Sequence, residues 1–135
     1  MLNKYLKVLL SSALLLTVGT SFSENVNAQV AVSTSGVDQI TDFSSSTDSI
    51  RLTKARFTAL DNTSNINGAL IDSDFAVVTS DSLAQGSSAE IVYNSSNGNL
   101  FYNQNNDAVG FGTGGLFATI AGSPLLAASN FVVFL

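Results

Sequence analysis

The chain has 135 residues, with 10 acidic and 5 basic side chains, no histidine and no cysteine. The lack of histidine and cysteine excludes Ser-His-Asp and Cys-His catalytic sites, thiolate chemistry and histidine-rich zinc sites. The net charge of −5 argues against nucleic acid as a partner, because phosphate binding needs clustered Lys and Arg, whereas divalent cations and basic partners remain open.

The first residues have the layout of a signal peptide. Lys4 and Lys7 form a positive segment, and residues 8–18 are mostly apolar. Val26-Asn27-Ala28 places a small residue before a cleavage point, so we predict a signal peptide over residues 1–28 and a secreted or periplasmic protein. The alternative is a membrane anchor, but the apolar run falls short of the roughly 20 residues that a spanning helix needs. We therefore expect no stable membrane span after the leader is cleaved.

The rest of the chain has the size of one domain with a modest core. Residues 29–36 predict a short tether or a first edge strand, and residues 37–135 a single β domain. Export would permit disulfides, but the chain has no cysteine to form them. Its stability must therefore come from the core, from a bound ion or from a partner.

Short alternating segments, each bounded by Ser, Asn, Asp or Gly, predict strands from residue 37 onward. The segment 39–43 (QITDF) predicts the first of them. The segment 49–52 alternates with a period of two, which predicts that Ile50 and Leu52 point inward and Arg51 outward.

A hairpin over residues 89–103 gives the clearest local signal. Two aromatic and β-branched runs, 90–93 and 100–102, flank the dipeptide Asn97-Gly98. Asparagine followed by glycine supplies the positive φ angles that a tight hairpin needs. The glycine-rich residues 110–115 then predict a flexible turn.

The remaining segments complete an all-β pattern. Residues 62–68 predict a loop, residues 71–77 either a helical turn or a strand, and residues 116–120 and 130–135 two closing strands. No long stretch has helical periodicity. The predicted fold is a small β-roll cap or a β-sandwich with the Asn-Gly hairpin, with or without one short helix. Three acid-or-amide plus Phe dipeptides, at 42–43, 74–75 and 130–131, are too few to predict a solenoid.

Two further motifs raise the question of catalysis. Asp72 and Asp74 would share a face on a strand, as paired carboxylates for glycoside hydrolysis require, but a solvated loop or the cap of a helical turn is the favoured interpretation. The stretch GFGTGG at 110–115 lacks both the GxGxxG spacing before a helix and the Lys-Ser/Thr of a phosphate loop. We therefore predict that the chain is not an enzyme.

Oxygen donors are the metal ligands that the sequence does offer. Asp38, Asp42 and Asp48 fall in one Ser-rich segment, and Asn103, Asn105, Asn106 and Asp107 in another. Calcium binds about six to eight oxygens from carboxylates, amides and backbone carbonyls. The alternative is that these residues form polar β-turns, in which Asn and Asp are common.

The order of these motifs resembles a known family. Residues 36–43 (GVDQITDF), 48–52 (DSIRL) and Phe57 resemble the end of RTX (hemolysin-type) calcium-binding proteins. The C-terminal flanking domain of that family is matched in order by Phe75, Ala84, residues 91–94, Gly98, residues 100–102, residues 120–121 and Phe131. The resemblance covers residues 36–135 and implies a β-roll cap that packs on calcium-loaded repeats.

The sequence departs from the family pattern in three ways. The glycine-aspartate nonapeptides that hold most of the calcium are missing, apart from Gly36 and Asp38. The family implies Asp, Asp and Gly where this chain has Asn103, Asn105 and Asn106. An N-terminal leader also differs from type I export, which reads a C-terminal signal.

Together these features predict a secreted, non-catalytic, RTX-like module with Ca²⁺ as its ion. The expected ligands are Asp38, Asp42 and Asp48, with Asn103, Asn105 and Asp107 as a second, weaker set. The alternative function is a calcium-independent extracellular structural or adhesive β-domain, which would contact a protein or surface partner through its polar faces or edge strands.

Overall fold

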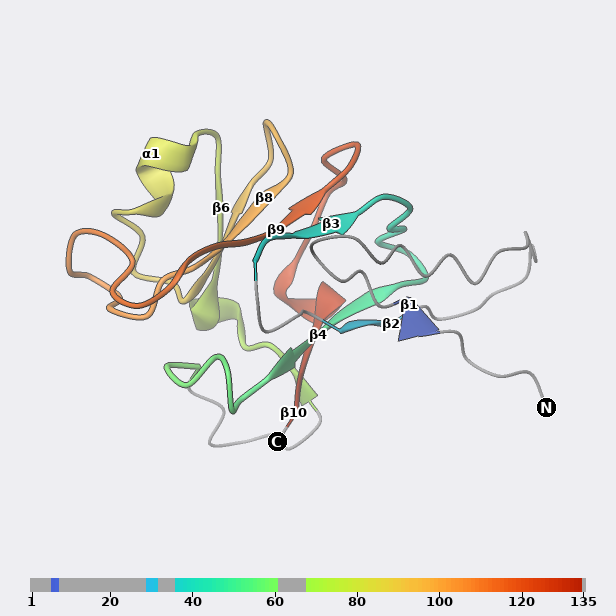
Figure 1. Ribbon diagram of the computed structural model, residues 1–135, viewed down its shortest axis with the longest axis horizontal. Coiled ribbons are helices and arrows are strands. Elements are labelled where there is room, and N and C mark those ends of the chain that lie inside the picture. Colours follow the sequence, from blue (N-terminus) through green and yellow to red (C-terminus); the bar gives the residue numbers. More distant parts are fainter. Residues whose placement is uncertain (1–5, 8–28, 32–35, 61–67, 135) are drawn as a thin grey trace.

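The computed structural model describes residues 6–7, 29–31, 36–60 and 68–134, and it confirms the all-β prediction (Figure 1). The described strands form two mixed sheets with the orders β1-β2-β4-β10-β5 and β3-β9-β8-β7-β6. The strands are β1 (Leu6–Lys7), β2 (Gln29–Ala31), β3 (Asp38–Ile40), β4 (Ser49–Thr53), β5 (Gly68–Ala69), β6 (Phe75–Val78), β7 (Ile91–Asn94), β8 (Asn99–Tyr102), β9 (Gly115–Ile120) and β10 (Phe131–Phe134). One short helix, α1 (Asp81–Ala84), and two 3-10 helices, η1 (Asp72–Asp74) and η2 (Ala128–Asn130), complete the described elements.

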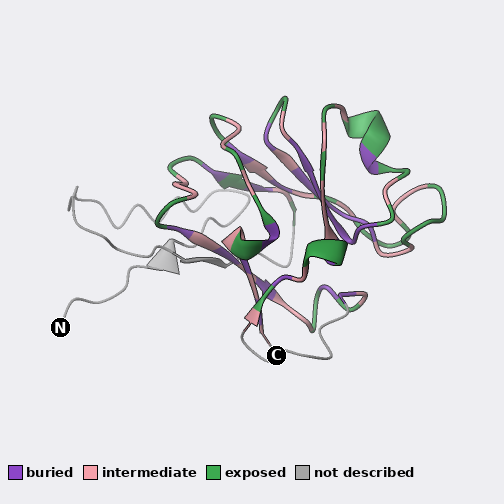
Figure 2. Ribbon diagram, turned by 180° about the vertical axis from the view of Figure 1, so that it is seen from behind, coloured by how far each residue is buried: buried purple, intermediate pink, exposed green. Residues whose placement is uncertain are grey.

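The two sheets pack face to face around the main apolar core. Ile50 and Leu52 of β4 point into this core as the alternation predicted, and Arg51 points away with its guanidinium 4.5 Å from the centre of the Phe134 ring. Figure 2 shows the buried residues concentrated where the strands cross, with exposed residues along the loops. Burying one such Ile or Leu side chain contributes about 1.5–3 kcal/mol, so the sandwich is the main source of stability.

Two coils of chain are stacked at one side of the sandwich. The chain runs from β3 in the second sheet through residues 41–48 to β4 in the first sheet, and it repeats this path from β9 through residues 121–130 to β10. β3 pairs in parallel with β9, and β4 pairs in parallel with β10. Asn130 Nδ2 donates to the Ser45 carbonyl at 2.8 Å and so joins the two turns. Stacked parallel coils of this kind are the arrangement of a β-roll.

The outer face of the second sheet carries a smaller apolar cluster. Ala84 of α1 packs on Val92 and Phe101, and Phe111 from the loop after β8 stacks on Phe101 with ring centres 5.1 Å apart. Helix α1 and this loop lie together at one end of the molecule in Figure 1. The second sheet is therefore covered on both faces along its middle.

Several boundaries differ from the sequence expectation. β3 ends at Ile40 and not at Phe43, because the chain must turn there to reach the opposite sheet. Residues 71–77 contain both proposed structures, η1 and then β6. The hairpin is confirmed, and within its described loop it is Gly98, with φ of 81°, that has the left-handed backbone and not Asn97.

The remaining predictions concern the tether, the leader, the loop after residue 60 and a membrane span. β2 pairs in parallel with β4, so residues 29–31 form a strand of the first sheet. Most of the predicted leader (residues 1–5 and 8–28), residues 32–35 of the predicted tether, residues 62–67 of the predicted loop and Leu135 lie outside the described residues. In the part of the chain that is described, no helix is long and apolar enough to cross a membrane.

Candidate functional site

A buried row of three polar side chains crosses the second sheet at one end of its strands. Asp74, Glu90 and Asn103 are 4%, 7% and 0% exposed. Asp74 and Glu90 each precede the paired residues Phe75 and Ile91 of the parallel strands β6 and β7. The Asn103 amide donates to the Glu90 carbonyl at 2.7 Å, which continues the antiparallel pairing of β7 with β8. The three residues are therefore adjacent across three neighbouring strands, and we call them the polar row.

The polar row lies on the outer face of the sheet. Alternate residues of a strand share a face, so Glu90 lies on the same side as Val92, and Asn103 on the same side as Phe101. Val92 and Phe101 belong to the outer apolar cluster beneath α1. The row therefore borders that cluster and is separated from the main core by the sheet itself.

The electrostatics of the row are unfavourable for two free carboxylates. Burial raises the pKa of Glu90 above its ordinary value, and the charge of Asp74 and the hydrogen bond between the two side chains raise this pKa further. Hydrogen bonds from the Glu90 backbone and from the Asn106 side chain oppose the shift. Two full charges about 4 Å apart repel by about 4 kcal/mol at an effective dielectric constant near 20. A shared proton or a bound cation would remove this repulsion.

The side-chain oxygen of Asn103 is buried and has no hydrogen-bond donor among the described residues. Its Nδ2 donates to the Ser87 carbonyl at 2.5 Å and to the Asn106 carbonyl at 3.0 Å. Its Oδ1 is buried and has no hydrogen-bond partner among the residues that the structure describes, and the same is true of Asn105 Oδ1 in the same turn. Leaving such an oxygen unsatisfied costs about 1–3 kcal/mol, so each atom calls for a hydrogen-bond donor, a water molecule or a cation.

The first predicted ligand set is spread over different environments. Asp38 is fully buried on β3, and Asp42 is exposed in the following turn. Asp48 accepts hydrogen bonds from the Ser44 amide at 2.8 Å and the Thr47 hydroxyl at 3.3 Å, so its carboxylate closes the turn before β4. Over residues 36–60 and 68–134, no group of three or more Asp, Glu, His or Cys side chains is arranged to hold a metal ion, and these three form no such group. Their joint binding of calcium stays a prediction.

The second predicted set includes one member of the polar row. Asn103 is buried, Asn105 is half-buried with its Nδ2 3.5 Å from the Val109 carbonyl, and Asp107 is exposed. Asn106 has φ of 50°, a left-handed backbone, at the position where the family resemblance implies glycine. Asparagine tolerates this conformation better than most residues, which explains how the turn keeps its shape without glycine.

The helical turn favoured for Asp72 and Asp74 is confirmed, and the two carboxylates do not form a pair on one face of a strand. Both residues lie in η1 and not on a strand, so Asp72 is exposed while Asp74 is buried. The partner of Asp74 is instead Glu90, from the neighbouring strand. Sequence reasoning missed Glu90 because it grouped acids by their separation along the chain. The available signal was an acid directly before each of two strands and an amide directly after a third.

The carboxylate of Asp81, on the outer face of the second sheet, is hydrogen-bonded to the hairpin. Asp81, in the first turn of α1, accepts hydrogen bonds from the side-chain amides of Asn94 at 2.6 Å, Asn97 at 3.1 Å and Asn99 at 3.0 Å. The bond from Asn94 is the main cause of the lowered pKa of Asp81. Each of these bonds is internal, so the cluster ties α1 to the hairpin.

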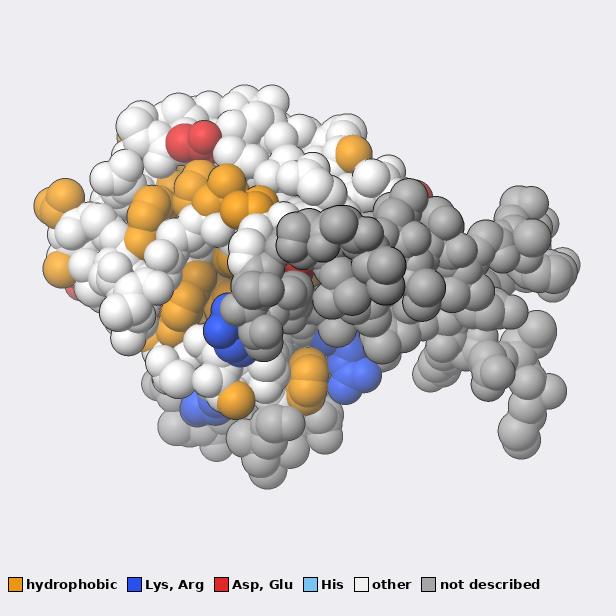
Figure 3. All heavy atoms as spheres, viewed as in Figure 1, with side chains coloured by type: hydrophobic (Ala, Val, Ile, Leu, Met, Phe, Trp, Pro, Cys, Tyr) orange, Lys and Arg blue, Asp and Glu red, His pale blue; other side chains and the backbone are white. Residues whose placement is uncertain are grey.

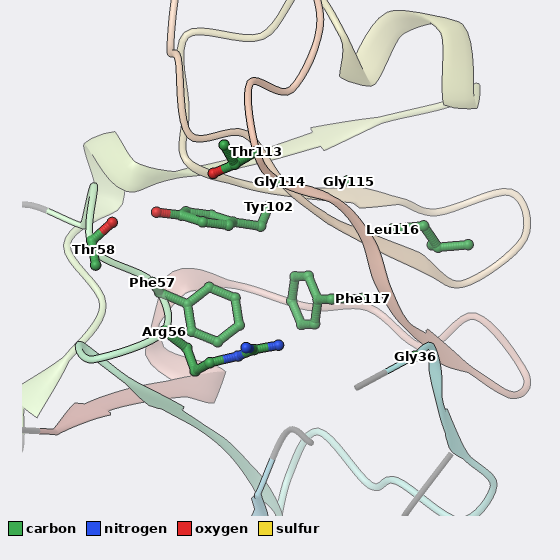
Figure 4. A pocket seen from close by; sticks show the side chains of 10 residues that line it. All are labelled: Gly36, Arg56, Phe57, Thr58, Tyr102, Thr113, Gly114, Gly115, Leu116 and Phe117. Atoms are coloured by element: carbon green, nitrogen blue, oxygen red, sulfur yellow. The ribbon is translucent and has the colours of Figure 1, made fainter. Parts of the chain in front are cut away.

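A pocket of about 290 Å³ opens at the edge of the sandwich (Figure 4). The rings of Phe57 and Tyr102 meet edge to face at 5.0 Å, and those of Phe57 and Phe117 at 5.1 Å. The Tyr102 hydroxyl already accepts the Ala59 amide at 2.8 Å. The lining is completed by Gly36, Arg56, Thr58, Thr113, Gly114, Gly115 and Leu116. Arg56 is the charged residue in this lining, which therefore offers no carboxylate to a cation.

The basic residues after residue 28 lie close together in the sequence. Arg51 and Lys54 belong to β4 and the turn after it, and the exposed Arg56 follows. Figure 3 shows Lys and Arg side chains gathered in the lower part of the face in view, on a surface that is otherwise mostly uncharged.

Comparison with protein-family models, with curated proteins and with solved structures finds no match to this chain.

Proposed function

We propose that this chain is an exported, non-catalytic β-domain that binds calcium. The observation that carries the proposal is the pair of buried oxygens, Asn103 Oδ1 and Asn105 Oδ1, that have no hydrogen-bond donor within the described ranges. They belong to the turn in which the resemblance to RTX proteins implies a D-x-D-G segment. The stacked coils that β3–β4 and β9–β10 form are in keeping with a β-roll cap.

The donor chemistry around this turn fits calcium. Calcium binds neutral amide oxygens together with carboxylates, and it tolerates irregular geometry. Amide oxygens alone bind it weakly, so carboxylates must contribute for the affinity to be useful. The ion would act by neutralising acidic charge and by stabilising the folded state, since a ligand that binds only the folded chain raises its stability.

Thermal unfolding of the full chain, followed by circular dichroism, tests the proposal. The midpoint would be measured in excess EDTA and then in millimolar calcium, with potassium chloride at matched ionic strength as the control. At a free concentration about 100 times its dissociation constant, calcium adds about 2.7 kcal/mol of stability. For a domain of this size, each kcal/mol raises the midpoint by about 4–8 °C. A midpoint that calcium leaves unchanged would contradict the proposal.

A calcium-independent structural domain is the second candidate, because the stacked turns are already joined without an ion. Asp48 closes its own turn through the Ser44 amide, and Asn130 connects the two turns through the Ser45 carbonyl. Such a domain would contact its partner or another copy through edge strands such as β6, which carries the half-exposed Val77. Sedimentation analysis in EDTA over a range of concentrations tests it, and a monomer at every concentration that binds no surface would count against it.

A further inference from the structure

Three oxygen-bearing side chains lie next to one another at the ends of three neighbouring strands. Asp74 precedes β6, Glu90 precedes β7 and Asn103 follows β8, and the strand pairing sets them side by side. The Asp74 and Glu90 side chains are hydrogen-bonded to each other and are 4% and 7% exposed. Two carboxyl groups held in contact and away from water require a positive charge between them, either a proton or a cation.

The orientation of the Asn103 side chain is fixed by its own hydrogen bonds. Both of its Nδ2 hydrogens are taken, by the carbonyls of Ser87 and Asn106. The amide therefore cannot be turned over to exchange its oxygen and nitrogen. Its Oδ1 remains buried, without a donor in any described part of the chain, on a residue that is fully buried beside Glu90. A proton shared by Asp74 and Glu90 leaves this oxygen to a water molecule or another donor, whereas a single cation can satisfy all three groups.

We propose that Asp74, Glu90 and Asn103 hold one calcium ion, with the two carboxylates as charged ligands and Asn103 Oδ1 as the neutral one. The inference rests on the proposed function and names its binding site. It differs from the ligand sets expected from the sequence, because Asp74 and Glu90 are far from the turn at 103–107 along the chain although they lie beside it in space. The all-oxygen donor set selects a hard cation over zinc, copper or nickel.

The position of the site gives the ion a structural role. It would bridge β6, β7 and β8 at the end where β6 follows η1 and where the loop over residues 103–114 begins. Asn106, whose side chain is hydrogen-bonded to Glu90, links that loop to the site. Binding is therefore expected to order the loop along with the strand ends.

Glu90→Gln in the full chain is the decisive variant. Glutamine has the size of glutamate, and its amide can donate to the Asp74 carboxylate in place of the shared proton. The matched control is Asp72→Asn, which removes the same charge from an exposed residue of η1. Calorimetric titration with calcium chloride and thermal unfolding in EDTA and in calcium would be run on both variants and on the wild type. Because charge count sets calcium affinity, we expect Glu90→Gln to weaken binding by about tenfold or more, and Asp72→Asn to leave it unchanged.

The outcomes separate this inference from the proposed function. Calcium binding by the wild type that Glu90→Gln retains in full would overturn the site and leave the proposed function standing. No heat and no change of midpoint in the wild type would overturn both. If Glu90→Gln does not fold in EDTA, Asp74→Asn carries the same test, because either substitution leaves a neutral group to bond the remaining carboxylate. Loss of calcium binding in a variant whose circular dichroism spectrum in EDTA matches the wild type supports the site.

Discussion

Replacing Gly98 with alanine should strongly destabilise the domain, because this residue is held between the hairpin and β9. Its φ is 81°, and an alanine Cβ would lie 2.0 Å from the Ile120 carbonyl oxygen. Its amide donates to the Asn94 carbonyl at 2.9 Å, and its carbonyl accepts from the Ile120 amide at 2.8 Å. A left-handed alanine costs about 1–2 kcal/mol and loss of the two hydrogen bonds about 0.5–1.5 kcal/mol each, so we expect a loss of about 2–5 kcal/mol.

Gly110→Ala is the matched control for this prediction. Gly110 also has a left-handed backbone, with φ of 93°, but its alanine Cβ would meet nothing within 4 Å. Only the backbone term applies there, so we expect a loss of about 1–2 kcal/mol. Urea unfolding of both variants gives the difference in free energy, provided that the slope with urea concentration stays constant. Equal losses in the two variants would refute the packing of the hairpin loop on β9.

Three further predictions concern single hydrogen-bonding or ionisable groups. Burial and the charge of Asp74 raise the pKa of Glu90 in the folded chain above its ordinary 4.5. In EDTA, protonated Glu90 therefore stabilises the fold fully at a pH below 4.5, and this stabilisation is lost as the pH rises through the higher pKa of the folded chain. Urea midpoints measured from acid to neutral pH would show this loss in the wild type and not in Glu90→Gln, and a rise would contradict it. Asn130→Ala should cost about 1–2 kcal/mol in thermal unfolding, because the Ser45 carbonyl and the Ala127 amide both lose a partner, whereas the exposed Ser129→Ala should be neutral. Tyr102→Phe should cost about 1 kcal/mol by urea unfolding, because the Ala59 amide loses its acceptor, and an unchanged stability would show that water replaces the hydroxyl.

Local patterns in the sequence were enough to predict much of the fold. The alternation at 49–52 gave β4 with Ile50 and Leu52 buried, and Asn97-Gly98 between two apolar runs gave the hairpin of β7 and β8. Both signals are local, since side-chain alternation and turn chemistry act over a few residues. The prediction for residues 39–43 ran too far because the position at which a strand leaves its sheet is set by the opposite sheet.

The polar row could not be found by local patterns. Asp74, Glu90 and Asn103 are far apart along the chain, and only the pairing of β6, β7 and β8 makes them neighbours. The acids that are close in sequence, Asp38 and Asp42, differ instead in burial. Pairing between distant strands depends on the whole core, so a cluster built across strands requires the sheet order before it can be recognised.

The two candidate functions rest on different parts of the domain. At the stacked turns, a neutral hydrogen bond from Asn130 to the Ser45 carbonyl joins the two coils. Asp48 closes the turn before β4 through the Ser44 amide, so neither contact needs an ion. On the outer face of the second sheet, Asp74 and Glu90 are in contact and Asn103 Oδ1 is buried, with no donor to it in the described structure. A domain built in this way would keep its two coils in EDTA and would lose order first at the end of β6, β7 and β8. Hydrogen exchange resolved by residue would then show calcium-dependent protection near Glu90 and Asn103, with calcium-independent protection at Ile50 and Phe131. The same loss of protection throughout the chain would mean that the ion stabilises the domain as one cooperative unit.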